Sequence, residues 1–459
     1  MAANKIPNWL ARAGERDGPI YSAIVEALEA AIQAGELQPG ERLPPQRTVA
    51  AWLGVDFTTV SRAYAAAQAR GLAEGSVGRG TFVRARTEDD EAGMVDLSMN
   101  LPPPPAGLSL GRLLEETTSA ILRRADASTL MSYHPGFGTL GQRLAGAQWL
   151  EPCLGAVPPE RVLVSPGAQP ALAAILATLC RPGDVVVAEP LTYPGFKAVA
   201  VQLGLRILAC PTDALGPEPA ALEAICAQER PAAVYLIPTL QNPVASTMDL
   251  TRRREVAQIV RAAGAWILED DPYSRLMDDP PPALASFLPD RTFHVATLAK
   301  CLTPGLRIAY VVRPPGPEGE RAALALRALA LNPAPLMAAI ATAWIREGVA
   351  ETVLGAVRTE ARARRALAAE LLPQAFGGPD SLHVWLPLDD AASPERLRLA
   401  GHERGLALVT AEAFAVGEIG RQGVRVSLGG PRKRAVLQGA LKALADLAQG
   451  APAASRLVV

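Results

Sequence analysis

The sequence has few cysteines, and their spacing argues against a disulfide framework or a zinc site. Its 459 residues contain five, and no two of them form a C-x-x-C pair or join a zinc-like cluster. Scattered, unpaired cysteines are typical of a protein that stays in a reduced compartment. We therefore expect a cytoplasmic protein without a bound metal. The five are Cys153, Cys180, Cys210, Cys226 and Cys301.

The sequence also lacks a segment that would direct it to a membrane. The first residues do not show a basic stretch followed by an apolar one, as a secretory signal would. The most apolar long window covers residues 322–345. It contains Arg327, Pro333 and Pro335, so it does not predict a membrane-spanning helix.

The net charge of −1 indicates no partner, but the charge is unevenly distributed. Between Gly40 and Arg86 there are seven arginines against three acidic residues. A basic segment in a nearly neutral chain is typical of a DNA-binding surface, although an ordinary solvated surface has the same composition. The length and the hydrophobic content of 49% predict two or three domains with packed cores.

The first 86 residues show the pattern of a winged helix-turn-helix. Apolar residues recur at helical spacing over residues 19–35, and shorter helices are expected over 46–53 and from Thr58 to Arg70. Glycine-containing turns separate these helices, and residues 72–83 alternate like a small hairpin.

Several motifs in this region resemble the GntR-type winged helix-turn-helix: Pro19-Ile20-Tyr21, residues 35–44, Arg47, residues 53–55, residues 58–64 and residues 78–83. In that family the helix that opens at Thr58 enters the major groove, where it meets phosphates and base edges. The resemblance implies DNA contacts by Arg47, Thr58, Thr59, Arg62 and Arg79. Asp56 and Phe57 stand where the family often has a serine and an arginine. Asp56 either caps the helix or shifts the contacts elsewhere. Taken singly, Thr58 could be only a cap and Arg62 only a solvated charge.

Strand-like and helix-like stretches alternate after residue 97. Continuous apolar strands between helices predict a parallel or mixed sheet covered on both faces, with ligands bound at the strand ends. An acidic segment without periodicity precedes it. We therefore expect a DNA-binding domain over residues 1–86, a linker over 87–96 and an α/β domain over 97–459. Strands are expected at 161–165, 184–188, 205–209, 233–237, 265–269, 293–297 and 308–312, and helices at 168–180, 194–203, 218–228 and 251–263.

Lys300 lies between an apolar run that ends near Ala296 and a strand-like run over residues 308–312. A lysine held between two buried strands loses solvation, which lowers its pKa and leaves a nucleophilic amine. On this stretch alone, a surface loop with an ordinary lysine is an equally good interpretation.

Polar or small residues follow four of the other expected strands. Residues 165–169 open a helix whose N–H groups can bind a phosphate. Tyr193 offers a flat ring, Asn242 an amide, and Asp270 a carboxylate that is costly to bury without a cation. Taken singly, Tyr193 could be a core residue and Asn242 a turn residue. Together with Lys300, the set matches the chemical groups of pyridoxal 5′-phosphate.

The ordered motifs resemble the fold-type-I aminotransferase family over about residues 97–445. In that family a large sheet domain carries a smaller C-terminal α+β subdomain. The resemblance implies that Lys300 forms an imine with the cofactor and that Asp270 holds the pyridine nitrogen. It implies that Arg425 clamps an amino acid carboxylate, although Arg425 could be only a surface strand residue. The other implied cofactor contacts are Tyr273 and Asn242 at the phenolic oxygen, Tyr193 on the ring, and Gly167, Ala168, Gln169, Thr297, Arg307 and Tyr133 of the partner subunit at the phosphate.

The order of a winged helix-turn-helix, a linker and an aminotransferase-like domain resembles the MocR branch of GntR-type regulators. The resemblance implies a homodimeric transcription factor that binds double-stranded DNA and senses an amino acid, amine or vitamer through the imine on Lys300. Two other interpretations are a working aminotransferase with an accessory DNA-binding domain and a cofactor-free dimerisation scaffold. Transamination does not require the first 86 residues, which favours regulation, and the intact cofactor set argues against the scaffold.

Overall fold

The computed structural model consists of two compact units, Met1–Ala92 and Gly93–Val459, and each has its own hydrophobic core. The predicted wing residue Arg79 and most of the predicted linker lie outside the described residues. The structure describes residues 6–15, 19–34, 36–37, 41–70, 72–76, 80–83, 94–124, 126–130, 132–134, 136–388, 393–418, 420 and 422–448.

The first unit is a winged helix-turn-helix, as predicted. A tight turn at Gly54 separates α3 from α4, and Gly54 adopts a φ of 63°, which glycine tolerates without strain. Val49, Val60 and Tyr64 lie in the core, and the Tyr64 hydroxyl donates to the carbonyl of Pro44 at 2.7 Å. The two strands form an antiparallel hairpin. The elements are α1 (Asn8–Ala11), η1 (Arg12–Glu15), α2 (Ile20–Gln33), α3 (Gln46–Leu53), α4 (Phe57–Ala69), β1 (Ala73–Ser76) and β2 (Gly80–Val83).

A seven-stranded mixed sheet organises the second unit, in the order β4-β12-β11-β10-β9-β5-β6. Only β12 runs antiparallel to its neighbours within this sheet. Each strand lies within one residue of its predicted position. The strands are β4 (Val162–Ser165), β5 (Val185–Ala188), β6 (Arg206–Ala209), β9 (Ala233–Leu236), β10 (Trp266–Asp270), β11 (Thr292–Thr297) and β12 (Ala309–Val312).

Helices cover both faces of the sheet, because successive strand residues point to opposite sides. Val186 and Tyr235 belong to the core that contains α8 and α9, whereas Val187 and Leu236 belong to the core that contains α10 and α11. This alternation explains why the strands read as continuous apolar runs. The helices are α8 (Ala168–Leu179), α9 (Pro194–Gln202), α10 (Pro219–Glu229) and α11 (Leu250–Ala263).

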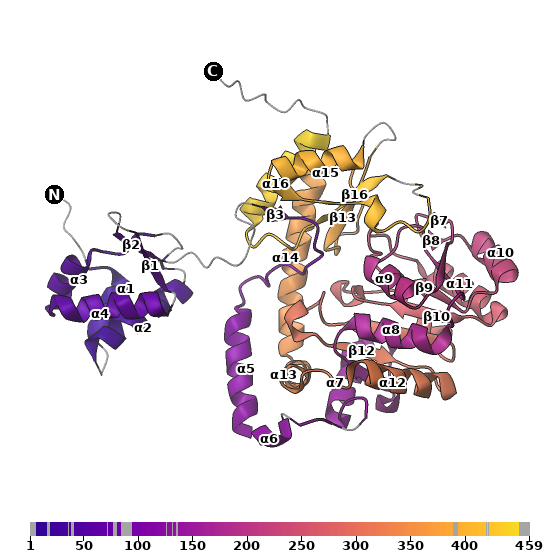
Figure 1. Ribbon diagram of the computed structural model, residues 1–459, viewed down its shortest axis with the longest axis horizontal. Helices are drawn as coiled ribbons and strands as arrows, with labels where there is room; N and C mark the ends of the chain where they lie inside the picture. Colours follow the sequence, from indigo (N-terminus) through magenta and orange to yellow (C-terminus); the bar gives the residue numbers. More distant parts are fainter. Residues whose placement is uncertain are drawn as a thin grey trace. The chain divides into compact units, whose positions relative to one another are not determined.

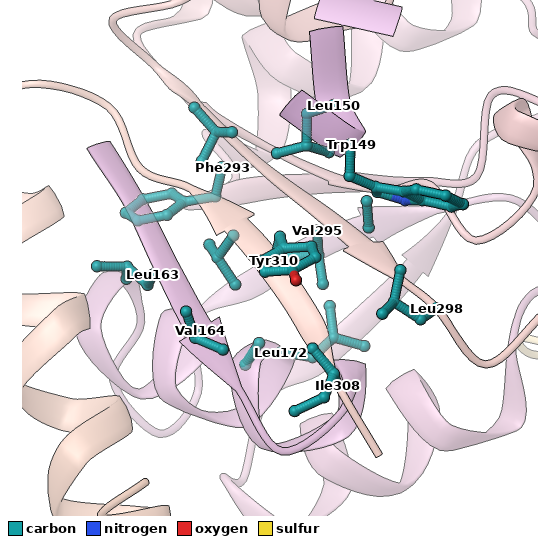
Figure 2. Packing of buried hydrophobic residues seen from close by; sticks show 14 of the residues in the cluster. Trp149, Leu150, Leu163, Val164, Leu172, Phe293, Val295, Leu298, Ile308 and Tyr310 are labelled. Carbon is teal, nitrogen blue, oxygen red and sulfur yellow. The ribbon is translucent and has the colours of Figure 1, made fainter. Parts of the chain in front are cut away.

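Close packing joins α7 (Leu140–Leu154) to the sheet. Figure 2 shows Tyr310 of β12 among side chains of neighbouring strands, with Trp149 of α7 on the same side. A Cβ at Gly146 would lie 2.5 Å from the Tyr310 ring, so glycine lets the helix approach the strand. On the opposite face of the sheet, α8 and α12 (Pro317–Ala330) lie side by side (Figure 1).

The 23-residue helix α14 (Val349–Leu371) leads from the large sheet to a smaller C-terminal subdomain (Figure 1). A three-stranded antiparallel sheet in the order β13-β16-β15 and two helices form this subdomain, as the family resemblance implied. The elements are β13 (His383–Pro387), α15 (Pro394–Glu403), β15 (Val409–Thr410), β16 (Gly423–Ser427) and α16 (Arg434–Ala448), with β3 (Val95–Asp96) paired to β14 (Leu406–Ala407). The remaining α-helices and strands are α5 (Leu110–Arg124), α6 (Ala127–Leu130), β7 (Thr212–Asp213), β8 (Gly216–Pro217) and α13 (Pro335–Arg346).

Within the described ranges, no helix combines the length and apolar character needed to cross a bilayer.

Candidate functional site

Lys300 follows β11 and lies in an environment that favours its neutral form. Its Nζ donates a hydrogen bond to the carbonyl of Asn100. Burial lowers the pKa of Lys300 to about 8, and the positive charges of Arg425 and Arg307 act in the same direction, against the charge of Asp270. The amine therefore has far more nucleophilic character at neutral pH than an exposed lysine.

Asp270 ends β10 with one carboxylate oxygen bound and the other open. The Tyr235 hydroxyl donates to Oδ2 at 2.7 Å, whereas Oδ1 is buried and has no hydrogen-bond partner among the described residues. Burial raises the pKa of Asp270 to about 6, opposed by the bond from Tyr235 and by Lys300. The group therefore remains mostly ionised at neutral pH, with an oxygen that can accept from a cationic donor.

Arg425 of β16 joins the C-terminal subdomain to this group. Its Nη1 donates to Oδ1 of Asn242 at 2.7 Å, and its Nη2 donates to the carbonyl of Ser98. The Tyr273 hydroxyl accepts from Nδ2 of Asn100 at 2.8 Å. Residues from four distant parts of the chain therefore meet here, and three of them, Arg425, Asn242 and Tyr273, are among the predicted site residues.

A third group gathers at the N-terminus of α8. Gly167 adopts a φ of 102°, and a Cβ there would lie 2.8 Å from Nη2 of Arg307. The Tyr193 hydroxyl donates to Oε1 of Gln169 at 3.3 Å, which links the predicted stacking residue to this helix. Oγ1 of Thr297 accepts from the N–H of Ala299 at 3.2 Å. The first N–H groups of α8, from Ala168 onwards, have no partner within the helix and can bind an anion.

Tyr133 does not join these residues within one chain. Its side chain is 81% exposed, in contrast to the buried residues around Lys300. The family resemblance implies that it reaches the phosphate of a partner subunit, and that role stays a prediction.

Several residues of the site were not predicted from the sequence. Tyr235 reads as a core residue of a buried strand, and only its hydroxyl in an otherwise apolar run hinted at a polar partner. Asn100 and His383 lie far from Lys300 in the sequence, in stretches without a recognisable motif. Their side chains lie 3.1 Å apart, from Nδ2 to Nδ1, and only the folded chain brings them together.

The residues around Lys300 fit pyridoxal 5′-phosphate. The open, buried Oδ1 of Asp270 suits the protonated ring nitrogen, since a buried carboxylate oxygen without a donor is otherwise costly. The N-terminus of α8, together with the guanidinium of Arg307, suits a phosphate. Lys300, with its lowered pKa, suits an aldehyde.

The predicted DNA-contacting residues that the structure describes, Arg47, Thr58, Thr59 and Arg62, lie near the starts of α3 and α4. Arg47, Thr58 and Arg62 are exposed, and the Arg62 guanidinium lies 4.7 Å from the centre of the Tyr21 ring. Asp56 caps α4: its Oδ1 accepts from the N–H of Thr58 at 2.7 Å and from its hydroxyl at 2.6 Å. Of the two alternatives for Asp56, the helix cap is therefore confirmed.

Comparison with known proteins places both units in families. Residues 20–83 match the gntR family of bacterial regulatory proteins, and residues 92–436 match the aminotransferase class I and II family. The uncharacterised HTH-type transcriptional regulator YdeF of Bacillus subtilis is 31% identical over 96% of each chain. The probable rhizopine catabolism regulatory protein MocR of Rhizobium meliloti is 30% identical over 66% of each chain. The chain belongs to the MocR-type transcriptional regulators.

Solved structures agree with this membership. The α-aminoadipate aminotransferase LysN of Thermus thermophilus, complexed with N-(5′-phosphopyridoxyl)-L-leucine, is 26% identical, with a TM-score of 0.72 over 78% of this chain and 93% of LysN. The second unit of this MocR-type regulator thus has the fold of a pyridoxal-phosphate-dependent aminotransferase. The family membership makes the protein a DNA-binding transcriptional regulator and favours this interpretation over an accessory DNA-binding domain on a working aminotransferase.

Proposed function

We propose that this MocR-type regulator binds pyridoxal 5′-phosphate at Lys300 and uses the site to sense an amino acid, an amine or a vitamer. The observation that carries the proposal is the open, buried oxygen of Asp270 beside a lysine of lowered pKa. When bound, pyridoxal 5′-phosphate supplies an aldehyde that condenses with amines.

The residues of the chain divide the work of holding and sensing. Asp270 holds a proton on the ring nitrogen, and Tyr235 orients that carboxylate. Gly167, Ala168, Gln169, Thr297 and Arg307 hold the phosphate, Tyr193 covers the ring, and Asn242 and Tyr273 reach the phenolic oxygen. Arg425 offers a fork of donors to the carboxylate of an amino acid effector.

Sensing requires that the effector change what Lys300 contacts. Lys300 donates to the carbonyl of Asn100, and Asn100 in turn donates to the Tyr273 hydroxyl. An effector amine that binds the aldehyde in place of Lys300 would free the lysine side chain and so alter these hydrogen bonds. A regulator responds to its effector through such a difference between two states.

We further propose that the regulator is a cytoplasmic homodimer. Helix α5 has 15 residues and none of them is buried. Large apolar side chains are also exposed at and near the ends of α5 and α7, namely Leu122, Tyr133, Leu140 and Leu144. A second copy on this surface would bury them and would bring Tyr133 of the partner subunit to the phosphate.

The first unit contacts DNA through the starts of α3 and α4 in this proposal. Arg47 and Arg62 supply positive charge, and Thr58 and Thr59 stand at the helix N-terminus with its free N–H groups. Arg79 was predicted on the wing and stays a prediction. Because the Thr58 hydroxyl donates to Asp56, that hydroxyl is left as an acceptor, which suits a base amino group better than a phosphate.

The Lys300 assignment is tested by chemical trapping. The full chain is incubated with pyridoxal 5′-phosphate, reduced with borohydride and digested, and the peptides are analysed by mass spectrometry. We expect the phosphopyridoxyl mass on Lys300. Lys300→Ala should lose that mass, whereas Lys197→Ala, a change at a partly exposed lysine on α9, should keep it on Lys300. A stable adduct on another lysine of the wild-type chain would refute the assignment.

A further inference from the structure

A cavity lies within the second unit, outside the residues assigned to the Lys300 site. Its volume is about 890 Å³, and its lining comes from β7, from the loops after β5 and β9 and from the C-terminal subdomain. Neither Lys300, Asp270 nor Arg425 lines it. Leu191, Val244 and Trp385 give it apolar walls. The cavity is therefore large enough for a small organic molecule with an apolar body.

One carboxylate gives this cavity its chemistry. Glu189 lines the cavity, although the residue is only 5% exposed. Oε2 accepts from Nε2 of Gln241 at 3.0 Å, and Oε1 has no hydrogen-bond partner among the described residues. Burial raises the pKa of Glu189 to about 8, against the hydrogen bond from Gln241. An ammonium group placed beside this carboxyl would lower its pKa and hold it in the ionised form.

The other acidic residue of the lining, Asp213, is already neutralised. Its two oxygens accept from Nη1 and Nη2 of Arg252 at 3.0 and 2.8 Å. Among the described lining residues there is neither lysine nor arginine. The described lining thus favours a ligand that is cationic and has an apolar body.

We propose that the Glu189 cavity binds an amine with an apolar body, its ammonium group at Glu189, and that binding is transmitted to Lys300 through Gln241, His383 and Asn100. This second site goes beyond the proposed sensing at Lys300 and rests on it only for the transmitted effect. The amine enters the cavity as an intact cation and forms no covalent bond there.

A continuous series of hydrogen bonds supports the transmission. Gln241 donates from Nε2 to Glu189, and its backbone carbonyl lies 3.0 Å from Nε2 of His383. His383 is held neutral, since burial and then Arg425 lower its pKa to about 3. With its proton on Nε2, Nδ1 accepts from Nδ2 of Asn100 at 3.1 Å. The carbonyl of Asn100 accepts from Lys300, so a shift of Gln241 reaches the reactive amine.

The binding site is tested with N,N-dimethylbenzylamine, a tertiary amine that is protonated at neutral pH and cannot condense with an aldehyde. Isothermal titration calorimetry of the full chain should show saturable binding. Glu189→Gln keeps an acceptor for Gln241 but removes the charge, and we expect binding to weaken about 10-fold or more, as for loss of a charge-assisted hydrogen bond. The neutral analogue N,N-dimethylbenzamide should bind the wild type more weakly by a similar factor.

Asp213→Asn is the matched control, because it removes the other lining carboxylate, which Arg252 already neutralises. We expect it to leave the affinity within about twofold. Equal affinity of wild type and Glu189→Gln, or an absence of saturable binding, would overturn the proposed site. None of these titrations needs the cofactor, so they stand apart from the outcome of the trapping experiment.

The transmission is tested by the rate at which the chain captures pyridoxal 5′-phosphate. N,N-dimethylbenzylamine at a concentration that fills most of the wild-type cavity should change that rate in the wild type, and at the same concentration it should have a smaller effect in Glu189→Gln, in proportion to the lower occupancy of the variant. A rate that stays the same in the wild type, while calorimetry shows the cavity filled, would overturn the transmission.

Discussion

The lowered pKa of Lys300 predicts how its capture of an aldehyde depends on pH. Only the neutral amine attacks, and with a pKa of about 8 instead of the ordinary 10.5 about one lysine in eleven is neutral at pH 7. With the ordinary value, about one in 3,000 would be neutral, so burial makes about 300-fold more amine available. Because the amine loses its charge as pH rises, capture should increase about tenfold per pH unit below 8 and level off above it.

The assay is stopped-flow absorbance after mixing the cofactor-free chain with pyridoxal 5′-phosphate between pH 6 and 9.5. The cofactor also titrates in this range, so the rate of a small model amine with pyridoxal 5′-phosphate is measured at each pH and corrected for the titration of that amine. Dividing the rate of the chain by this corrected rate leaves only the pH dependence of Lys300. Arg425→Gln should move the inflection to higher pH and slow capture at pH 7, because the Arg425 charge helps to lower the pKa of Lys300. Arg206→Gln, an exposed change on an outer strand of the same sheet, should not.

A corrected rate that keeps rising through pH 9.5 would show that Lys300 titrates like an exposed lysine. The inferred desolvation of the site would then be wrong. An inflection near 8 that Arg425→Gln leaves in place would instead remove Arg425 from the groups that act on Lys300.

Three other outcomes are expected. Tyr235→Phe removes the donor to Asp270 and should weaken the retention of pyridoxal 5′-phosphate about 10-fold in equilibrium dialysis. Tyr310→Phe, on another strand of the same sheet, should leave retention unchanged. Equal retention by Tyr235→Phe and the wild type would exclude Tyr235 from the site. Asp56→Asn keeps a cap for α4 but removes a negative charge, so it should strengthen binding to DNA as measured by fluorescence anisotropy. Arg62→Ala should weaken binding and should reduce the slope of the log binding constant against log salt concentration by about 1. If both variants bind like the wild type, the contacts lie elsewhere. Steady-state transamination of common amino acids should be slow or absent, and turnover of about 1 per second or more would favour a working aminotransferase.

The predicted elements were accurate where the sequence carries a repeated local signal. The strands of the large sheet are uninterrupted apolar runs because both faces are buried, and this composition is visible without the fold. The turn at Gly54 and the cap at Asp56 depend on residues next to each other in the chain, so they too could be predicted from the sequence.

The site was only partly predictable, since motifs mark residues at strand ends but not the residues that position them. Lys300, Asp270 and Asn242 stand in recognisable motifs, and the structure brings them together. Tyr235 and Asn100 act through contacts with residues 35 and 200 positions away. No local pattern encodes such contacts.

The sequence alone determined the two-part organisation, a parallel or mixed sheet and the residues at the ends of its strands, because periodicity and turn chemistry are properties of short segments. Only the tertiary structure decided which oxygen of Asp270 is left open, that burial lowers the pKa of Lys300, and that Glu189 faces a separate cavity. These features arise from desolvation and from hydrogen bonds between distant segments. Both depend on what surrounds a side chain in space, which its neighbours in the chain do not specify.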